Sequence, residues 1–172
     1  MISTKKMSVV RLLFNFIPTS RLHNLKASLL RWAGVTVGEN VEIFSTAKII
    51  GNMTLKIGDN CFIGHEAMIM GSFGSTIIME NFCKIGSRTI LVTGTHRFSS
   101  DGHCIEKEGG FKNITISSGA VVSTSSLILP GVIVGKMAHV APGAVVSKNV
   151  PPYHRVGGVP AKIIKDLREN VE

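Results

Sequence analysis

Aliphatic residues recur at every sixth position through most of the chain after Val35. In the second half the count is unbroken, and it runs through Ile116, Val122, Ile128, Val134, Val140 and Val146. Four positions after each of these comes a small or β-branched residue, namely Ala120, Ser126, Val132, Ala138, Ala144 and Val150. A period of six fits neither an amphipathic helix nor a simple alternating strand. It predicts a solenoid in which each hexad supplies one short strand and one turn, and three hexads close a triangular coil.

The second strong feature is the place where the repeat breaks. Two short insertions interrupt its first half, and residues 97–113 then leave it altogether. This long segment begins directly after Thr95 and His96. Insertions in a repeat protein project as loops from one face, which is often the face that binds ligands. We therefore expect a loop insertion at 97–113 and a functional site beside it.

A helical segment is predicted before the repeat, in residues 1–34, with a break near Pro18 because proline ends or kinks a helix. Its second half has an apolar stripe at helical spacing, formed by Leu22, Leu25, Leu29 and either Trp32 or Ala33. The basic residues of this half lie outside the stripe: Arg21, Lys26 and Arg31. We expect this helix to pack on the end of the domain that follows. The alternative is a basic amphipathic helix that rests on an anionic membrane.

At the other end, the repeat stops at the prolines of positions 151 and 152. The basic residues that follow, Lys162, Lys165 and Arg168, predict a short basic helix. The expected layout is therefore an N-terminal helical segment at 1–34, a β-helix domain at 35–160 that contains the insertion, and a C-terminal helix at 161–172. The fold class is an all-β solenoid.

Composition narrows the class of protein. The formal net charge of +8 suggests a polyanionic partner, such as nucleic acid, an anionic membrane surface or a phosphorylated cofactor. No paired Cys/His motif and no aromatic RNA-binding run accompanies this charge, so we expect no nucleic-acid partner. Coenzyme A, which carries a diphosphate and a 3'-phosphate, suits a local basic cluster.

The cysteines indicate a reducing compartment, because Cys61, Cys83 and Cys104 make neither an even disulfide framework nor a Cys-x-x-Cys metal pattern. Cys61 and Cys83 take the small inward position of the repeat, so we expect both in the core. Arg11 and Asn15 interrupt the apolar run of the N-terminal segment, and no small-residue cleavage site follows it. No stretch is long enough to span a bilayer. We therefore expect a cytoplasmic protein.

Three landmarks link the repeat to a known superfamily: LVTGTH at residues 91–96, LPGV at residues 129–132 and VGGVPAK at residues 156–162. With them, residues 35–165 resemble the hexapeptide-repeat acyltransferases, which include galactoside and maltose acetyltransferases and many polysaccharide O-acetyltransferases. The N-terminal segment, which ends in LLRWAG, is most similar to capsule, O-antigen and exopolysaccharide acetyltransferases. The resemblance implies a left-handed parallel β-helix built from hexapeptide repeats.

The resemblance also implies a mechanism and an assembly. Such enzymes are homotrimers whose active sites lie in grooves between neighbouring β-helices, and acetyl-CoA is their cosubstrate. By this resemblance His96 is the general base that takes the proton of an acceptor hydroxyl, a role that suits an imidazole with an ordinary pKa of about 6.5. Thr124 matches the position whose backbone N–H stabilises the oxyanion. The cofactor-binding positions of the family correspond to Ser147, Lys148, Lys162 and Lys165.

The expected acceptor is a hydroxyl of a saccharide, as a precursor of capsule, O-antigen or exopolysaccharide. Galactoside and maltose enzymes carry an Asn where this chain has Gly64, which argues against simple galactoside or maltose specificity. His65 and Glu66 beside it, and His103 in the insertion, are candidate acceptor-binding residues. An amino-sugar amine or a xenobiotic alcohol is the alternative acceptor.

Two other classes share this architecture. A γ-type carbonic anhydrase is also a β-helix, but it needs three histidines around one metal ion. His65, His96 and His103 do not reproduce that arrangement, so we expect no metal. A non-catalytic β-helix scaffold at a membrane is the alternative from a different class, and it predicts no binding of acetyl-CoA.

Overall fold

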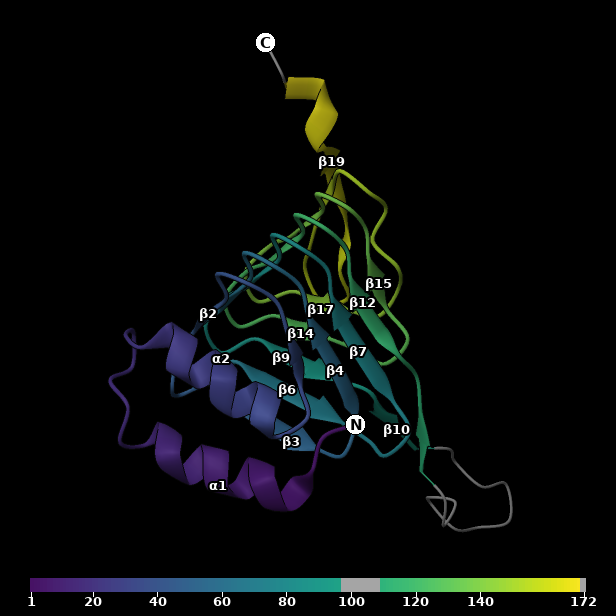
Figure 1. Ribbon diagram of the computed structural model, residues 1–172. Coiled ribbons are helices and arrows are strands. Elements are labelled where there is room, and N and C mark those ends of the chain that lie inside the picture. The colour runs from purple at the N-terminus through teal and green to yellow at the C-terminus, as the bar shows by residue number, and fades with distance from the viewer. Residues whose placement is uncertain (97–108, 171–172) are drawn as a thin grey trace, which may run out of the picture.

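The computed structural model describes residues 1–96 and 109–170, in which the chain winds through three parallel sheets in turn (Figure 1). The first sheet contains β1 (Thr36–Val37), β4 (Thr54–Ile57), β7 (Thr76–Met79), β12 (Ile114–Ile116) and β15 (Ile133–Val134). The second contains β2 (Glu42–Ile43), β5 (Phe62–Ile63), β8 (Lys84–Ile85), β13 (Val121–Val122), β16 (His139–Val140), β18 (His154–Gly157) and β19 (Lys162–Asp166). The third contains β3 (Lys48–Gly51), β6 (Met68–Gly71), β9 (Ile90–Val92), β14 (Leu127–Ile128) and β17 (Val145–Val146).

The predicted six-residue ladder is confirmed by the register between coils. In the second sheet one inward column pairs in order through Ile43, Ile63, Ile85, Val122, Val140 and Val156. All of these side chains are buried, and each buried aliphatic side chain contributes about 1.5–3 kcal/mol to stability. Cys61 and Cys83 lie in the same core, as expected.

The N-terminal segment forms two helices, α1 (Thr4–Phe14) and α2 (His23–Trp32), and the chain changes direction between them around Pro18, as predicted. Helix α2 packs on β1 and β2 and so covers the first coil, which confirms that it closes the end of the domain (Figure 1). The face that it uses matches the predicted apolar stripe only in part, because Ala33 is buried and Leu29 packs partly buried against the core. The packed face is formed by Lys26, Ala27, Leu30 and Ala33, while Leu22, Leu25 and Trp32 are exposed.

The open edge of the first coil explains which side of α2 packs. No strand precedes this coil, so its outward-pointing carbonyl groups lack a neighbouring strand to donate hydrogen bonds to them. The buried Lys26 Nζ donates to the carbonyls of Thr19 (2.7 Å) and Ile43 (2.9 Å). Arg31 donates in the same way to the carbonyls of Val37 (2.9 Å) and Gly38 (2.7 Å). A buried carbonyl without a partner costs about 1–3 kcal/mol. These bonds therefore favour turning the side of α2 that carries Lys26, rather than the side that carries Leu25 and Trp32, against the coils.

The predicted C-terminal helix at 161–172 is wrong for most of its described length. Residues Lys162–Asp166 form strand β19, which pairs antiparallel with β18, and only a 3₁₀ turn follows at Leu167–Asn170. The adjacent β-branched residues Ile163 and Ile164 favour a strand. The edge of β18 also offers unpaired backbone groups, which β19 satisfies.

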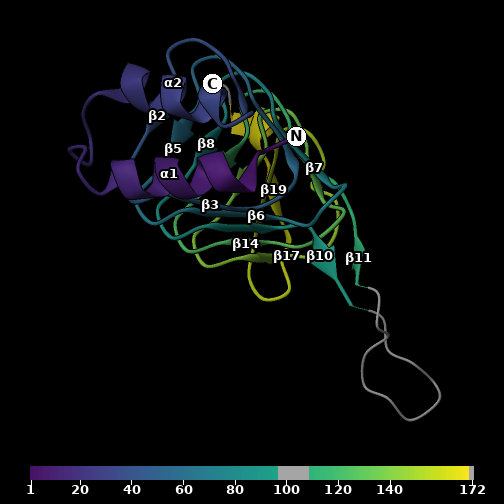
Figure 2. The ribbon, with the colours of Figure 1, turned by 60° about the horizontal axis from the view of Figure 1, so that its bottom comes forward.

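The predicted insertion leaves the prism at the edge between the third and first sheets. Its base is a two-stranded antiparallel hairpin of β10 (Gly94–Thr95) and β11 (Gly110–Phe111), which projects away from the coils (Figure 2). Within residues 1–96 and 109–170, no helix is long and apolar enough to cross a membrane.

Candidate active site

His96 stands at the base of the projecting hairpin, directly after β10, and its side chain is exposed. Its ring lies beside Gly109 on the returning strand, since a Cβ built on Gly109 would be 3.7 Å from ring atoms Nδ1 and Cε1. The hairpin thus holds the imidazole out from the coils, where a second molecule can reach it. His103, the other histidine predicted near the site, lies outside the described residues.

A buried polar network anchors this hairpin, and the spacing of the residues did not reveal it. Thr93 is fully buried, and its Oγ1 donates to Ser75 Oγ (2.9 Å) and accepts from the backbone N–H of Ser72 (3.0 Å). The backbone N–H of Lys112, on the returning strand, donates to the carbonyl of Thr93 (3.0 Å). The short insertion before Met79 supplies both serines. The two serines therefore hold Thr93 in place, three positions before His96.

Thr124 lies in the exposed turn between β13 and β14, at the opposite edge of the third sheet from His96. Gly86 stacks directly on it, and a Cβ on Gly86 would lie 2.6 Å from the backbone nitrogen of Thr124. The Thr124 carbonyl accepts from the N–H of Gly143 in the next coil (3.0 Å). Within one chain, the structure does not bring Thr124 and His96 together.

Ser147 and Lys148 follow β17 at the same edge of the prism as His96. Strands β9, β14 and β17 are neighbours in that order, so these residues lie two strand spacings, or about 10 Å, from the hairpin along the axis. Lys148 and Lys162 together line a hollow of about 310 Å³ at the last coil, whose floor is Val146, Val150 and Val156. Lys165 is exposed three residues farther along β19 and does not line this hollow.

His65 and Glu66 occupy the turn before β6, at the same edge as Thr124. His65 Nδ1 lies 2.8 Å from Thr46 Oγ1, and Glu66 Oε2 accepts from Arg88 Nε at 2.9 Å. The hydrogen bond from Arg88, together with the nearby His65, holds the pKa of Glu66 below its usual value. Glu66 is therefore an ionised, partnered carboxylate, and neither residue meets His96 within one chain.

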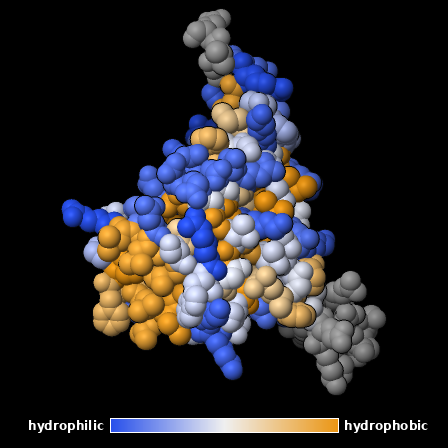
Figure 3. Space-filling model, in the orientation of Figure 1, coloured by the Kyte–Doolittle hydropathy of each residue, from blue (hydrophilic) through white to orange (hydrophobic). Residues whose placement is uncertain are grey.

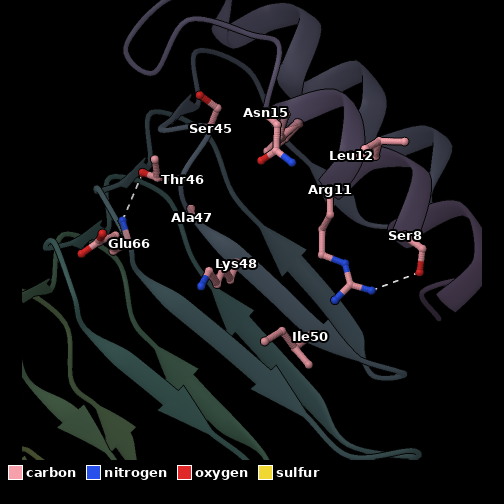
Figure 4. A pocket seen from close by; sticks show the side chains of 11 residues that line it. Ser8, Arg11, Leu12, Asn15, Ser45, Thr46, Ala47, Lys48, Ile50 and Glu66 are labelled. Carbon is pink, nitrogen blue, oxygen red and sulfur yellow. Dashed lines mark hydrogen bonds between the residues drawn. The ribbon is translucent and has the colours of Figure 1, made fainter.

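A larger pocket, of about 680 Å³, opens between helix α1 and the coils beside this turn (Figure 4). Helix α1 contributes Ser8, Arg11 and Asn15 to its wall, and the coils contribute Thr46, Lys48 and Glu66 among others. Arg11 extends from the helix toward β3 and donates from Nη2 to Ser8 Oγ (3.0 Å) (Figure 4). Sequence reasoning missed this pocket, because it depends on where α1 packs.

Potential metal ligands do not gather in the part of the chain that the structure describes: no three His, Cys, Asp or Glu side chains there are placed to hold one ion. A stack of hexad coils, with a hairpin that presents a histidine at one edge, defines a parallel β-helix of hexapeptide repeats.

Comparison with known proteins gives the same class. No family model matches the chain. The galactoside O-acetyltransferase of Escherichia coli K12 is 27% identical over 146 residues, which cover 84% of this chain and 70% of that protein. The putative colanic acid biosynthesis acetyltransferase WcaF of the same strain is 29% identical over 151 residues, which cover 88% of this chain and 78% of that protein.

Among solved structures, a hexapeptide-repeat acetyltransferase of Vibrio cholerae O1 biovar eltor, crystallised with acetyl coenzyme A, is similar over 95% of this chain and 86% of its own. The TM-score is 0.78 and the sequence identity 25%. Over most of its length, the chain is therefore similar in sequence and fold to acetyltransferases of the hexapeptide-repeat kind.

Proposed function

We propose that this protein transfers an acetyl group from acetyl-CoA to a hydroxyl of a saccharide, as a precursor of capsule, O-antigen or exopolysaccharide. The observation that carries the proposal is the exposed His96 at the base of a hairpin, on the edge that also carries Ser147 and Lys148. The similarity to WcaF supports a polysaccharide precursor as acceptor.

In the proposed reaction a ring nitrogen of neutral His96 takes the proton of the acceptor hydroxyl while the oxygen attacks the thioester carbonyl carbon. The C–O bond forms, the carbonyl oxygen becomes an oxyanion, and the N–H of Thr124 donates to it. The C–S bond then breaks, and the CoA sulfur leaves with the proton that His96 has carried. General-base help of this kind is worth about 10²- to 10⁴-fold in rate.

This mechanism needs His96 and Thr124 near the same carbonyl, yet they stand at opposite edges of one face of the prism. A neighbouring copy that presents its hairpin edge to the Thr124 edge of the first would complete the site. Two different edges meet in such a contact, so repeating it head to tail closes a ring of identical copies, as in a cyclic homo-oligomer. We therefore propose the homotrimer that the family resemblance implies.

For acetyl-CoA, the proposed phosphate contacts are Lys148 and Lys162 at the rim of the last-coil hollow, with Ser147 beside them. Within the described residues, neither ammonium group has a hydrogen bond or an ion pair. Two unpaired cations at one hollow suit a diphosphate. Lys165, which points elsewhere, is expected to contribute less.

For the acceptor, we propose the pocket between α1 and the coils, where Glu66 lies in the wall. Gly64 leaves no space for a side chain, since a Cβ there would lie 2.8 Å from the backbone nitrogen of Ser87. This crowding supports an acceptor other than a simple galactoside or maltose. The two cations Arg11 and Lys48 in the same wall favour an acceptor that carries negative charge.

A thiol-release assay with acetyl-CoA, over a panel of sugars, nucleotide sugars, amino sugars and xenobiotic alcohols, tests both donor and acceptor. His96→Ala is expected to lose at least about 10²-fold of turnover with unchanged sedimentation, while the matched variant His154→Ala keeps its activity. Near-normal turnover of His96→Ala would reject His96 as the base. Isothermal titration with acetyl-CoA separates the enzyme from a non-catalytic scaffold, for which no heat of binding is expected.

A further inference from the structure

Helix α1 has an apolar stripe that faces away from the protein. Its inward side buries Met7, Val10 and Phe14, as expected for a helix that packs on a domain. Its outward side carries Val9, Leu13 and, just beyond the helix end, Phe16, while the exposed Leu12 borders the pocket between α1 and the coils. Phe16 is 81% exposed, which is the highest value among the large apolar side chains that the structure describes. Packing on the coils does not explain this second stripe.

Helix α2 adds to the same surface, because part of its predicted apolar stripe is turned outward as well. Leu22, Leu25 and Trp32 are all exposed, whereas Lys26 is buried. Figure 3 shows a broad apolar area over the two helices, and α1 and α2 pack side by side. We call this surface the helical patch, formed by Val9, Leu13, Phe16, Leu22, Leu25 and Trp32. A contiguous exposed apolar area of this kind marks an interaction surface.

The charged side chains of the two helices and of their connection are all basic. The sequence holds no acidic residue before Glu39. The exposed cations Lys5, Lys6 and Arg21 belong to the two helices and their connection, and Lys6 Nζ lies 5.1 Å from the centre of the Trp32 ring. Leucines, a tryptophan and a phenylalanine among lysines and arginines are the composition of helices that lie in the interface of anionic membranes.

We propose that the helical patch docks on the surface of a bilayer that contains anionic phospholipid. The outward side chains enter the boundary between headgroups and acyl chains, and the flanking cations lie against the phosphates. A second copy of this chain fits the patch less well, because a twofold contact would bring Lys5, Lys6 and Arg21 toward their own equivalents. Since α1 has only 11 residues and no described helix could span a bilayer, the contact is peripheral. This inference does not depend on the proposed reaction.

Co-sedimentation of the full chain with vesicles tests the proposal. We expect binding to vesicles of three parts phosphatidylcholine and one part phosphatidylglycerol, weaker binding as salt is raised, and little binding to phosphatidylcholine alone. The pair Lys5→Glu and Lys6→Glu is expected to lower the partition coefficient at least about tenfold. Phe16→Ser is expected to lower it about tenfold as well, because one large apolar side chain no longer enters the interface.

Matched control variants separate binding through the helical patch from effects of overall charge and of exposed apolar side chains elsewhere. Phe82→Ser removes another exposed phenylalanine, and the pair Lys56→Glu and Lys84→Glu makes the same charge change on the coils. These controls should bind as the wild type does. Absence of binding to anionic vesicles, equal binding to neutral ones, or equal losses in the controls would overturn the proposal. A smaller particle mass for Phe16→Ser at sedimentation equilibrium would also overturn it, because the patch would then be a contact between copies.

Discussion

The two ends of the β-helix both carry clusters of basic side chains, but they use them in opposite ways. At the first coil, Lys26 and Arg31 donate to backbone carbonyls of the open edge and are part of the structure. At the last coil, strand β19 covers the edge instead, and the ammonium groups of Lys148 and Lys162 stay at the rim of a hollow. Lys26 and Arg31 are unavailable to a ligand because they bond backbone carbonyls. Lys148 and Lys162 are available because a strand, and not their side chains, covers the edge of the last coil. Stability and cosubstrate affinity should therefore respond to lysine changes at different ends.

The largest expected effect is at the first end. Lys26→Met keeps the apolar stem but leaves the carbonyls of Thr19 and Ile43 without the ammonium donor, so we expect a loss of about 3 kcal/mol in the free energy of unfolding. Urea denaturation measures it, with the exposed Lys136→Met as control. If Lys26→Met and the control were equally stable, the distinction between the two ends would fail.

The pH dependence of the free energy of unfolding, compared between wild type and Lys26→Met, provides a second test. Burial lowers the pKa of Lys26, so the folded protein gives up this proton at a lower pH than the unfolded chain does. Between the lowered pKa and the ordinary lysine value of about 10.4, the unfolded state binds more protons, and stability from this group rises with pH. Wild type should thus gain stability over Lys26→Met as the pH is raised through that window. A constant difference between the two proteins would contradict the burial.

At the last end, the double change Lys148→Ala and Lys162→Ala should raise KM for acetyl-CoA by about tenfold, since charge-assisted hydrogen bonds to phosphate are lost. Turnover at saturation and the urea midpoint should stay near the wild-type values. Steady-state kinetics at two salt concentrations measures the effect. Lys165→Ala provides the comparison within β19, and a rise in KM as large as that of the double variant would move the phosphate contacts away from the hollow.

A smaller effect is expected for Arg31→Ala, about 1 kcal/mol in stability, because its two hydrogen bonds lie partly in solvent. Arg31→Lys should restore part of the loss, since it keeps one donor. Chemical denaturation of the three proteins checks the order. A variant Arg31→Ala with wild-type stability would contradict a role for Arg31 in securing this edge.

The smallest effect concerns pH at the later coils. Burial, and then the charge of Arg155, lowers the pKa of His139, whose Nε2 lies 2.8 Å from Ser123 Oγ. Below the ordinary histidine pKa the unfolded chain binds the proton first, so stability falls as the pH drops from about 6.5 toward the lowered value. His139→Gln should remove this component of acid sensitivity. Thermal unfolding between neutral and mildly acidic pH tests it, and equal acid sensitivity in both proteins would contradict the assignment.

The sequence was sufficient for the coils and insufficient for their ends, for one physical reason. Inward columns such as Ile63 and Ile85 repeat because each coil buries the same position, so spacing alone reveals them. The place of His96 was also readable, since the repeat stops there. Lys26, in contrast, looks like a solvent-facing lysine until the carbonyl edge that it bonds is known. The strand at Lys162–Asp166 likewise depends on the open edge of β18, and the pocket beside α1 depends on how two helices fold back on the first coils.

Helix α1 separates the pocket from the apolar stripe on its outer side, and the thickness of the helix sets the distance between them. Ser8, Arg11 and Asn15 line the pocket on one side of this helix, while Val9, Leu13 and Phe16 face outward on another. A helix with its side chains is only about 10–12 Å across. Any molecule held in that pocket is therefore separated from whatever lies against the outer stripe by a single helical wall. An acceptor with a long apolar tail would need to span only the width of this helix to place its sugar in the pocket and its tail beside the outer stripe.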